Sequence, residues 1–489
     1  MDFCKMFRLL SFMILPFLVS CSVSKNYDPN KKYPREELQQ DYSLLRNILE
    51  EKHPSLYWYT PKDSMDMYFD KGYQSIADSM TELQFGWQIL APLTSFIRCG
   101  HTSFGMSKEW NKFIQGKRIP SFPYHVKVWN DTMMVMGSLN RNDTTIKRGE
   151  FITAINGVKN AEMIQSMFDY MAADGYADNV NYIRLSSSFP YFHRNIFGLY
   201  QNYFVQFSDS LGNEKSAVIP FFSPSRESVA KTMQQKVVRK KVSRKKNREH
   251  IRSLKYDSSF ALLTINRFTK GNLNQFIRRS FRDIEKKKVE NLVIDLRANS
   301  GGKIDKSVLL TRYLANARFK IADSAYSISK NFAPFGRYIS HSFGNNIGLT
   351  LLTKKKADNN YHFGFWERHH FKPKRKNHYS GNVYILVNGL TFSASTLFCN
   401  IIKGQDNVFI AGEETGGGWY GNTGILIPGI TLPHTKLKVG LPFFRLVQYQ
   451  HIKQKGTGII PDIYIGPNWR DILNGTDTKM EEIKRIINQ

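Results

Sequence analysis

The spacing of apolar residues predicts helices in the first hundred residues of the chain. Apolar side chains between Leu38 and Leu49 recur at three- and four-residue steps, the period of a helix with one buried face. The pair His53-Pro54 ends this segment, because the residue before a proline is disfavoured in a helix. Two more helices are predicted at 62–79 and 81–97, with Thr81 as the N-cap of the second.

Further along the chain the apolar period shortens. Residues 124–129 alternate between apolar and polar, and residues 133–136 form a short apolar run. Both segments are predicted to be strands. Residues 260–265, 272–287 and 291–296 then read as strand, amphipathic helix and strand, which is typical of a layered βα core. The pattern therefore predicts a multidomain α+β protein of helices, then strands, then a βα core.

One strand of this core leads into a helix that begins with serines. The apolar run Val383–Val387 is followed by the turn pair Asn388-Gly389 and by a predicted helix from Phe392 to about Lys403. A Ser at such a helix start lies beside free N–H groups, which can stabilise an oxyanion. On this pattern alone, the simpler interpretation is that Ser393 or Ser395 only caps the helix.

Two glycine-rich segments change that interpretation. The sequence IDLRANSGG ends at Gly301-Gly302, and AGEETGGG covers 411–418. The order IDLRANSGG, VNGLTFSAST, AGEETGGG resembles the tail-specific, or carboxy-terminal processing, family of serine proteases. The resemblance covers the core from about Asp257 to Ile465, and extends to the N-terminal helices and to a PDZ-like insert.

The resemblance implies a catalytic site for peptide hydrolysis. Ser393 matches the family's nucleophile, and the amides of Gly301, Gly302 and Ala394 match its oxyanion hole. One branch of the family uses a Lys of the glycine-rich motif as the base, but residues 412–420 contain no Lys.

The other, tricorn-like branch of the family takes its base from an upstream Gly-His-Thr motif. This chain has that motif at Gly100-His101-Thr102, so the resemblance implies His101 as the base in a Ser–His arrangement. We therefore expect an acyl-enzyme on Ser393 and a peptide or protein substrate.

The group that orients His101 departs from the family pattern. The family uses a Glu near a C-terminal Gly-x-x-Pro-Asp motif and a Ser before the His. Here a Lys stands in place of that Glu within 451–462, and Gly100 stands in place of the Ser. Glu413, Glu414 and Asp462 are the candidate acids. A catalytically inactive family member that binds peptides remains the alternative to a serine endopeptidase.

The resemblance also implies that the chain is divided into several domains. It implies an N-terminal helical domain, a PDZ-like domain that either binds peptide ends or serves as a spacer, and a ClpP/crotonase-like protease core. These domains are expected at 35–110, 115–222 and 257–470, with a basic linker at 223–256 and a C-terminal helix at 471–489.

The N-terminus predicts export. Basic residues precede an apolar segment, Leu9–Val19, that is too short to span a bilayer comfortably. Leu18-Val19-Ser20-Cys21 then resembles a bacterial lipoprotein processing site. We expect a signal peptide at 1–20, lipidation of Cys21 and a tether at 21–34. The protein would then be anchored by lipid in the cell envelope, facing the periplasm or the surface.

Charge and cysteines add little to this picture. The formal net charge of +28 suits binding to anionic lipid, acidic polymers or nucleic acid, and export argues against nucleic acid.

An exported protein can keep a disulfide, but we favour Cys99 and Cys399 as buried free thiols. The sequence predicts no metal and no cofactor.

Overall fold

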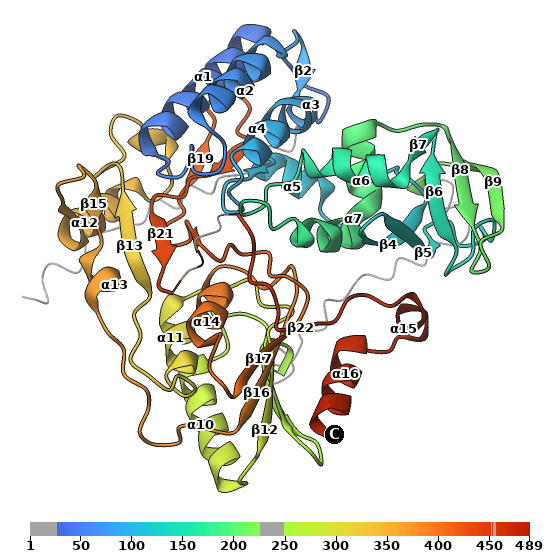
Figure 1. Ribbon diagram of the computed structural model, residues 1–489. Helices are drawn as coiled ribbons and strands as arrows, with labels where there is room; N and C mark the ends of the chain where they lie inside the picture. Colours follow the sequence, from blue (N-terminus) through green and yellow to red (C-terminus); the bar gives the residue numbers. More distant parts are fainter. Residues whose placement is uncertain (1–26, 225–248, 451, 453–455) are drawn as a thin grey trace, which may run out of the picture.

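The computed structural model describes residues 27–224, 249–450, 452 and 456–489 (Figure 1). The predicted signal peptide, the predicted lipidation site at Cys21 and most of the predicted basic linker lie outside the described residues. No helix within the described ranges combines the length and the apolar character that crossing a membrane requires.

Helices dominate the first part of the chain, as predicted. The predicted helix at 81–97 consists of three consecutive pieces, with the capping box of Thr81 and Gln84 at its start and Pro92 in the last piece. The elements are β1 (Lys32–Tyr33), α1 (Arg35–Lys52), α2 (Lys62–Gln74), β2 (Met80–Thr81), α3 (Glu82–Gln84), the π-helical η1 (Phe85–Leu90), α4 (Ala91–Phe96), β3 (Phe104–Gly105) and α5 (Lys108–Ile114).

An antiparallel sheet with two helices follows. Its strands are ordered β4-β5-β6-β8-β9, with β7 paired to β6. The elements are β4 (Tyr124–Trp129), β5 (Thr132–Ser138), β6 (Phe151–Ile155), β7 (Val158–Lys159), α6 (Asn160–Phe168), α7 (Asn179–Phe197), β8 (Asn202–Ser208) and β9 (Glu214–Pro220). The apolar pattern does not predict α7, which contains Pro190 and a kink at Ser188.

The central sheet forms the βα core. Its order is β10-β11-β12-β16-β17-β22, and all neighbours except β10 and β11 are parallel. The strands are β10 (Arg252–Tyr256), β11 (Ala261–Ile265), β12 (Asn291–Asp295), β16 (Asn382–Val387), β17 (Val408–Gly412) and β22 (Ile463–Tyr464).

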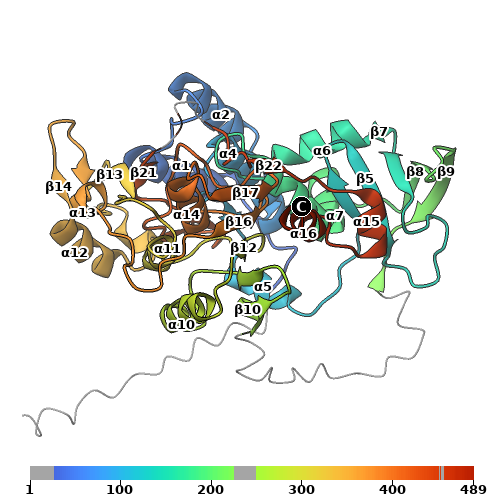
Figure 2. The ribbon, with the colours of Figure 1, turned by 60° about the horizontal axis from the view of Figure 1, so that its bottom comes forward.

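Helices cover both faces of the central sheet (Figures 1 and 2). On one face, α10 (Leu273–Lys286), α11 (Ile304–Thr311) and α14 (Ala394–Ile402) share one hydrophobic cluster with the strands. On the other face lies α16 (Thr478–Ile487), preceded by α15 (Trp469–Asn474). Because β12, β16 and β17 are parallel neighbours, their carboxyl ends meet at one edge of the sheet.

The segment between β12 and β16 is more ordered than its weak sequence pattern indicates. The sequence pattern of residues 324–379 predicts a loop-rich insertion. Its short strands nevertheless join a sheet ordered β14-β15-β13-β21-β18, in which β13 pairs with β21 from far along the chain. The elements are β13 (Ala322–Ser327), η2 (Gly336–Tyr338), α12 (Ser342–Leu352), β14 (Lys354–Lys355), β15 (Tyr361–His362), α13 (Gly364–Arg368), β18 (Gly421–Asn422) and β21 (Arg445–Gln448).

A small three-stranded sheet joins the N-terminal helices to the core. β19 (Gly429–Thr431) pairs with β20 (Lys438–Gly440), and β20 pairs with β3. The Gly440 amide also donates a hydrogen bond to the Ser103 carbonyl at 3.1 Å. The loop between α4 and β3, which contains His101, is therefore held against the core.

Candidate active site

Ser393 stands on a strained turn between β16 and α14. Its φ of 55° and ψ of −119° are unusual for a residue with a side chain, and such a conformation costs on the order of 1–3 kcal/mol. The turn places Ser393 directly before the first helical residue, Ala394. Ser395, the other serine of the motif, is fully buried in α14 and its hydroxyl has no partner among the described residues. Ser393 is therefore the serine that the turn presents.

Hydrogen bonds from the neighbouring loops hold this turn in place. The Thr391 hydroxyl donates to the Leu296 carbonyl at 3.1 Å, and the Phe392 amide donates to the Asn299 carbonyl at 3.2 Å. The Gly417 amide donates to the Thr391 carbonyl at 3.2 Å. The loops after β12, β16 and β17 thus support one another at the carboxyl edge of the sheet.

Two of the three predicted oxyanion-hole residues, Gly301 and Ala394, lie beside Ser393. A Cβ on Gly301 would stand 2.7 Å from the Ser393 Cβ and 3.0 Å from the Ala394 nitrogen, so only glycine allows this approach. The Gly301 amide donates to the Asn299 Oδ1 at 3.0 Å. The Gly302 and Ala394 amides have no acceptor among the described residues. Ala394, at the N-terminus of α14, is the best-placed donor for an oxyanion.

His101 lies across from Ser393. A Cβ on Gly424 would stand 2.8 Å from the Ser393 Oγ and 3.2 Å from the His101 Nε2, so the two catalytic candidates flank the same point. The rings of His101 and Phe392 pack with their centroids 5.0 Å apart. No direct hydrogen bond joins Ser393 to His101 in the described structure. Apo catalytic sites are often loose in this way.

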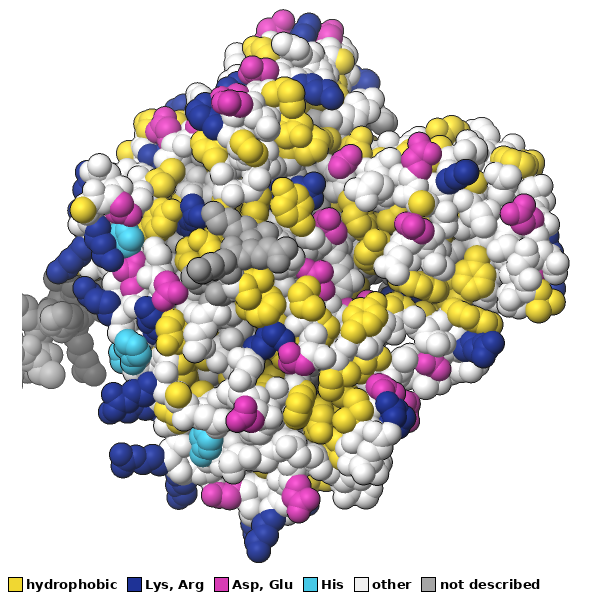
Figure 3. All heavy atoms as spheres, viewed as in Figure 1, with side chains coloured by type: hydrophobic (Ala, Val, Ile, Leu, Met, Phe, Trp, Pro, Cys, Tyr) yellow, Lys and Arg dark blue, Asp and Glu magenta, His cyan; other side chains and the backbone are white. Residues whose placement is uncertain are grey.

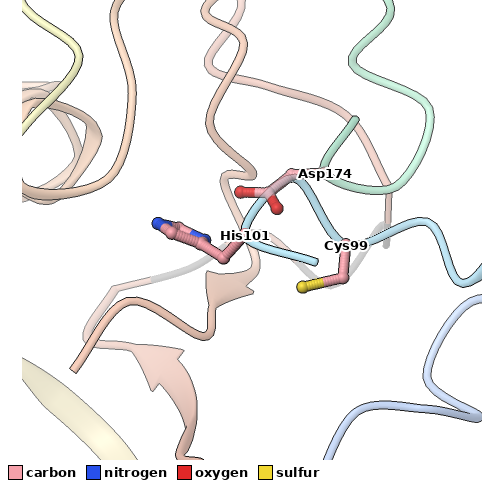
Figure 4. Close-up of side chains that lie close together, drawn as sticks. All are labelled: Cys99, His101 and Asp174. Atoms are coloured by element: carbon pink, nitrogen blue, oxygen red, sulfur yellow. The ribbon is translucent and has the colours of Figure 1, made fainter. Parts of the chain in front are cut away.

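Asp174 is the acid that faces His101, and the sequence motifs did not point to it. It lies in the loop between α6 and α7 and is 3 % exposed. One of its oxygens lies within 4.8 Å of a His101 ring nitrogen, and Figure 4 shows the carboxylate between His101 and Cys99. Its oxygens accept hydrogen bonds from the Gly100 amide at 2.7 Å and from the Gly418 amide at 3.4 Å.

Asp174 also explains why a glycine precedes His101. A Cβ at Gly100 would stand 2.5 Å from the Phe392 ring and 3.1 Å from the Asp174 Oδ1. The space that a larger residue would occupy at position 100 is therefore taken by these two side chains.

The environment of His101 favours its neutral imidazole. Burial lowers the pKa of His101, and the negative charge of Asp174 partly offsets this. Burial raises the pKa of Asp174, while His101 and the two amides that it binds act in the opposite direction. A His with a lowered pKa is in the form that accepts a proton near neutral pH.

Thr423 and Cys99 complete the surroundings of His101. The Thr423 hydroxyl lies 3.5 Å from the His101 Nδ1 and 3.0 Å from the Cys99 Sγ. Cys99 and Cys399 are both buried and free, as predicted. Burial raises the pKa of Cys99 to about 11 and that of Cys399 to about 12, so neither is a reactive thiolate.

Cys99, His101 and Asp174 are also the described residues best arranged to hold a metal ion, because their donor atoms lie within 4.8 Å of one another. A metal would need the thiolate, and burial opposes it. We therefore assign these groups to proton chemistry.

Comparison with known proteins places part of the chain in a known family. Residues 259–465 match the family model "Peptidase family S41". These residues form a peptidase family S41 domain. This is a family of serine peptidases. No curated protein matches the chain in sequence.

Solved structures show the same fold at low identity. Mature CPAF complexed with lactacystin is 13 % identical, with a TM-score of 0.61 over 93 % of this chain and 98 % of that one. A CPAF mutant is 12 % identical, with a TM-score of 0.63 over the same shares. A further structure of mature CPAF is 13 % identical, with a TM-score of 0.60 over 93 % of this chain and 96 % of that one.

The three acids proposed from the S41 motifs are engaged elsewhere. Glu413 binds Lys479 at 2.7 Å, and Glu414 accepts the Gly458 amide at 2.6 Å. Asp462 binds Lys403 and accepts the Ile410 amide at 2.9 Å. None of these contacts involves His101. A Lys replaces the family's Glu within the segment 451–462. Residues 451 and 453–455 of that segment lie outside the described residues.

A methyl group at Gly417 tests whether the packing around the Ser393 turn positions the serine. Its Cβ would stand 2.2 Å from the Thr396 Oγ1 and 3.0 Å from the Ser393 nitrogen. We expect Gly417→Ala to displace Ser393 and to slow its reaction with a fluorophosphonate by about tenfold or more, since small misplacements of reacting groups are costly. The control Gly105→Ala, whose Cβ meets nothing within 4 Å, should react at the wild-type rate. Equal rates in both variants would show that this packing does not position the serine.

Proposed function

We propose that this protein is a serine endopeptidase in which Ser393 is the nucleophile, His101 the base and Asp174 the residue that positions His101. The observation that carries the proposal is the approach of the Ser393 Oγ and the His101 Nε2 to one point beside Gly424. The match of residues 259–465 to peptidase family S41 supports the same reaction class.

The proposed reaction follows from these positions. His101 takes the proton of Ser393 as its Oγ attacks a peptide carbonyl, and an oxyanion forms. The Ala394 amide and the N-terminal end of α14 stabilise this oxyanion. His101 then gives the proton to the leaving amine, and an acyl-enzyme remains on Ser393. Water, deprotonated by His101, releases the second product.

Asp174 acts through charge in this proposal. No direct hydrogen bond joins it to His101 in the described structure, so its carboxylate works as a fixed negative charge close to the ring. That charge stabilises the imidazolium formed at each proton transfer. The amides of Gly100 and Gly418 hold the carboxylate in place.

We also propose a domain organisation and a cellular location for the protein. We assign residues 35–110 to an N-terminal helical domain, 115–222 to a PDZ-like domain that binds peptide ends or serves as a spacer, and 257–470 to a ClpP/crotonase-like core. We further propose lipidation at Cys21 and a place in the cell envelope. The alternative, an inactive peptide-binding member of the family, is favoured by one observation, the missing hydrogen bond between Ser393 and His101.

A fluorophosphonate probe distinguishes the peptidase from the inactive protein. The protein is made from residues 22–489, which include every described residue. We expect the wild type to be labelled on Ser393, because an activated serine attacks phosphorus as it attacks a carbonyl. Ser393→Ala should abolish labelling and His101→Ala should slow it by about a hundredfold or more. Ser395→Ala is the matched control and should be labelled. A folded wild type that is not labelled would contradict the proposal.

The pH dependence of labelling tests the role of Asp174. His101 reacts as the neutral base, and burial lowers its pKa, so the rate should fall on acidification with a midpoint below the ordinary value of about 6.5. Asp174 raises this pKa. Asp174→Asn should therefore move the midpoint to lower pH and reduce the plateau rate about tenfold or more.

The control for this test is Asp178→Asn, which removes a carboxylate that lies 3.7 Å from Arg98 instead. It should leave the midpoint and the plateau rate unchanged. An Asp174→Asn profile that superimposes on the wild type would remove Asp174 from the mechanism.

A further inference from the structure

Helix α12 exposes an apolar face. Phe343, Ile347 and Leu351 are 81 %, 50 % and 77 % exposed, and their four-residue spacing places them on one side of the helix. Leu349, on the opposite side, is buried in the cluster formed with the N-terminal helices. A Cβ on Gly344 or Gly348 would meet nothing within 4 Å. Nothing in the described structure covers this face.

Cations border the same helix. Arg337 lies on η2, which packs beside α12, and Lys354 and Lys355 follow its C-terminus. All three are exposed and form no ion pair with a described residue. Figure 3 shows Lys, Arg and His side chains along the left edge of the molecule, the side on which Figure 1 places α12 and α13.

Few carboxylates balance these cations. Residues 330–376 contain ten Lys and Arg but only Asp358 and Glu367 as acids. Glu367 binds Lys356 at 2.6 Å and His362 at 2.6 Å, and Asp358 binds His362 at 2.9 Å. Both acids are thus engaged with basic groups, and the border of α12 is positively charged.

We propose that α12 and the cations beside it form a docking surface for an anionic lipid bilayer. A helix with an apolar face and bordering Lys or Arg lies in the membrane interface, its apolar side chains among the acyl chains and its cations at the headgroups. A second copy of the chain fits this surface less well, because a symmetric contact pairs the surface with itself and so brings two positively charged borders together. The proposal does not depend on peptidase activity.

The surface is connected to the active site through one sheet. β14, which carries Lys354 and Lys355, is the first strand of the sheet ordered β14-β15-β13-β21-β18. β18 ends at Asn422, immediately before Thr423 beside His101. Docking through α12 therefore fixes how the site is oriented relative to the bilayer.

Vesicle co-sedimentation of the protein made from residues 22–489, which lacks any acyl chain, tests the apolar part of the surface. The wild type should bind phosphatidylglycerol-containing vesicles and bind pure phosphatidylcholine vesicles at least tenfold more weakly. Phe343→Ser/Leu351→Ser should reduce binding to the anionic vesicles about tenfold or more. The control Leu211→Ser changes a side chain that is 86 % exposed in the turn between β8 and β9, and should bind as the wild type does.

The charged part is tested in the same assay. Lys354→Gln/Lys355→Gln should weaken binding to anionic vesicles about tenfold, whereas the control Lys286→Gln/Lys287→Gln, on exposed residues at the end of α10, should change it far less. Fluorophosphonate labelling should be the same in all these variants.

Equal binding to neutral and anionic vesicles, or unchanged binding of Phe343→Ser/Leu351→Ser, would overturn the proposal. Light scattering after size exclusion adds one more outcome. A wild-type dimer that Phe343→Ser/Leu351→Ser converts to a monomer would assign the face to a second copy instead.

Discussion

The site depends on one buried carboxylate. Asp174 binds the amides of Gly100 and Gly418 and so joins three segments that lie far apart in the sequence. A buried charge is costly unless hydrogen bonds compensate it, and here the two amides supply that compensation. The arrangement holds the His101 loop, which comes from the helical N-terminal part, against the glycine-rich loop of the core.

The second constraint is the strained turn at Ser393. The parallel strands β12, β16 and β17 end together, and the loops that follow them exchange hydrogen bonds through Leu296, Asn299 and Gly417. These contacts hold Ser393 at a positive φ that a free chain would avoid. Strain of this kind persists where the surroundings enforce it, and here it directs the hydroxyl towards His101.

The sequence predicts the parts of the structure whose signal is local. The strands and α10 of the core follow from apolar periodicity, and the order of three glycine- and serine-containing motifs indicates the S41 resemblance. The serine motif selects Ser393 and the upstream Gly-His-Thr motif selects His101. The structure brings these two residues to the two sides of Gly424. Helix α7 is missed because Pro190 interrupts its pattern, and β13 because its partner β21 lies more than a hundred residues away.

Asp174 could not be found in this way. It belongs to no motif and lies in a loop before an unpredicted helix, so only the fold brings it to His101. The glycine at position 100 was an indirect signal, since it showed that the family's usual helper was absent. None of the acids proposed from the motifs has a contact with His101 among those that hold it in place, because each is engaged with another partner.

The central claim is that Asp174 acts on the reaction through His101. A double-mutant cycle tests it most directly, with the acylation rate of Ser393 measured in the wild type, Asp174→Asn, His101→Ala and the double variant. The account predicts that Asp174→Asn slows the wild type but has no further effect once His101 is removed. If the two substitutions instead slow acylation independently, so that their effects multiply, Asp174 does not work through His101 and the proposed arrangement is wrong.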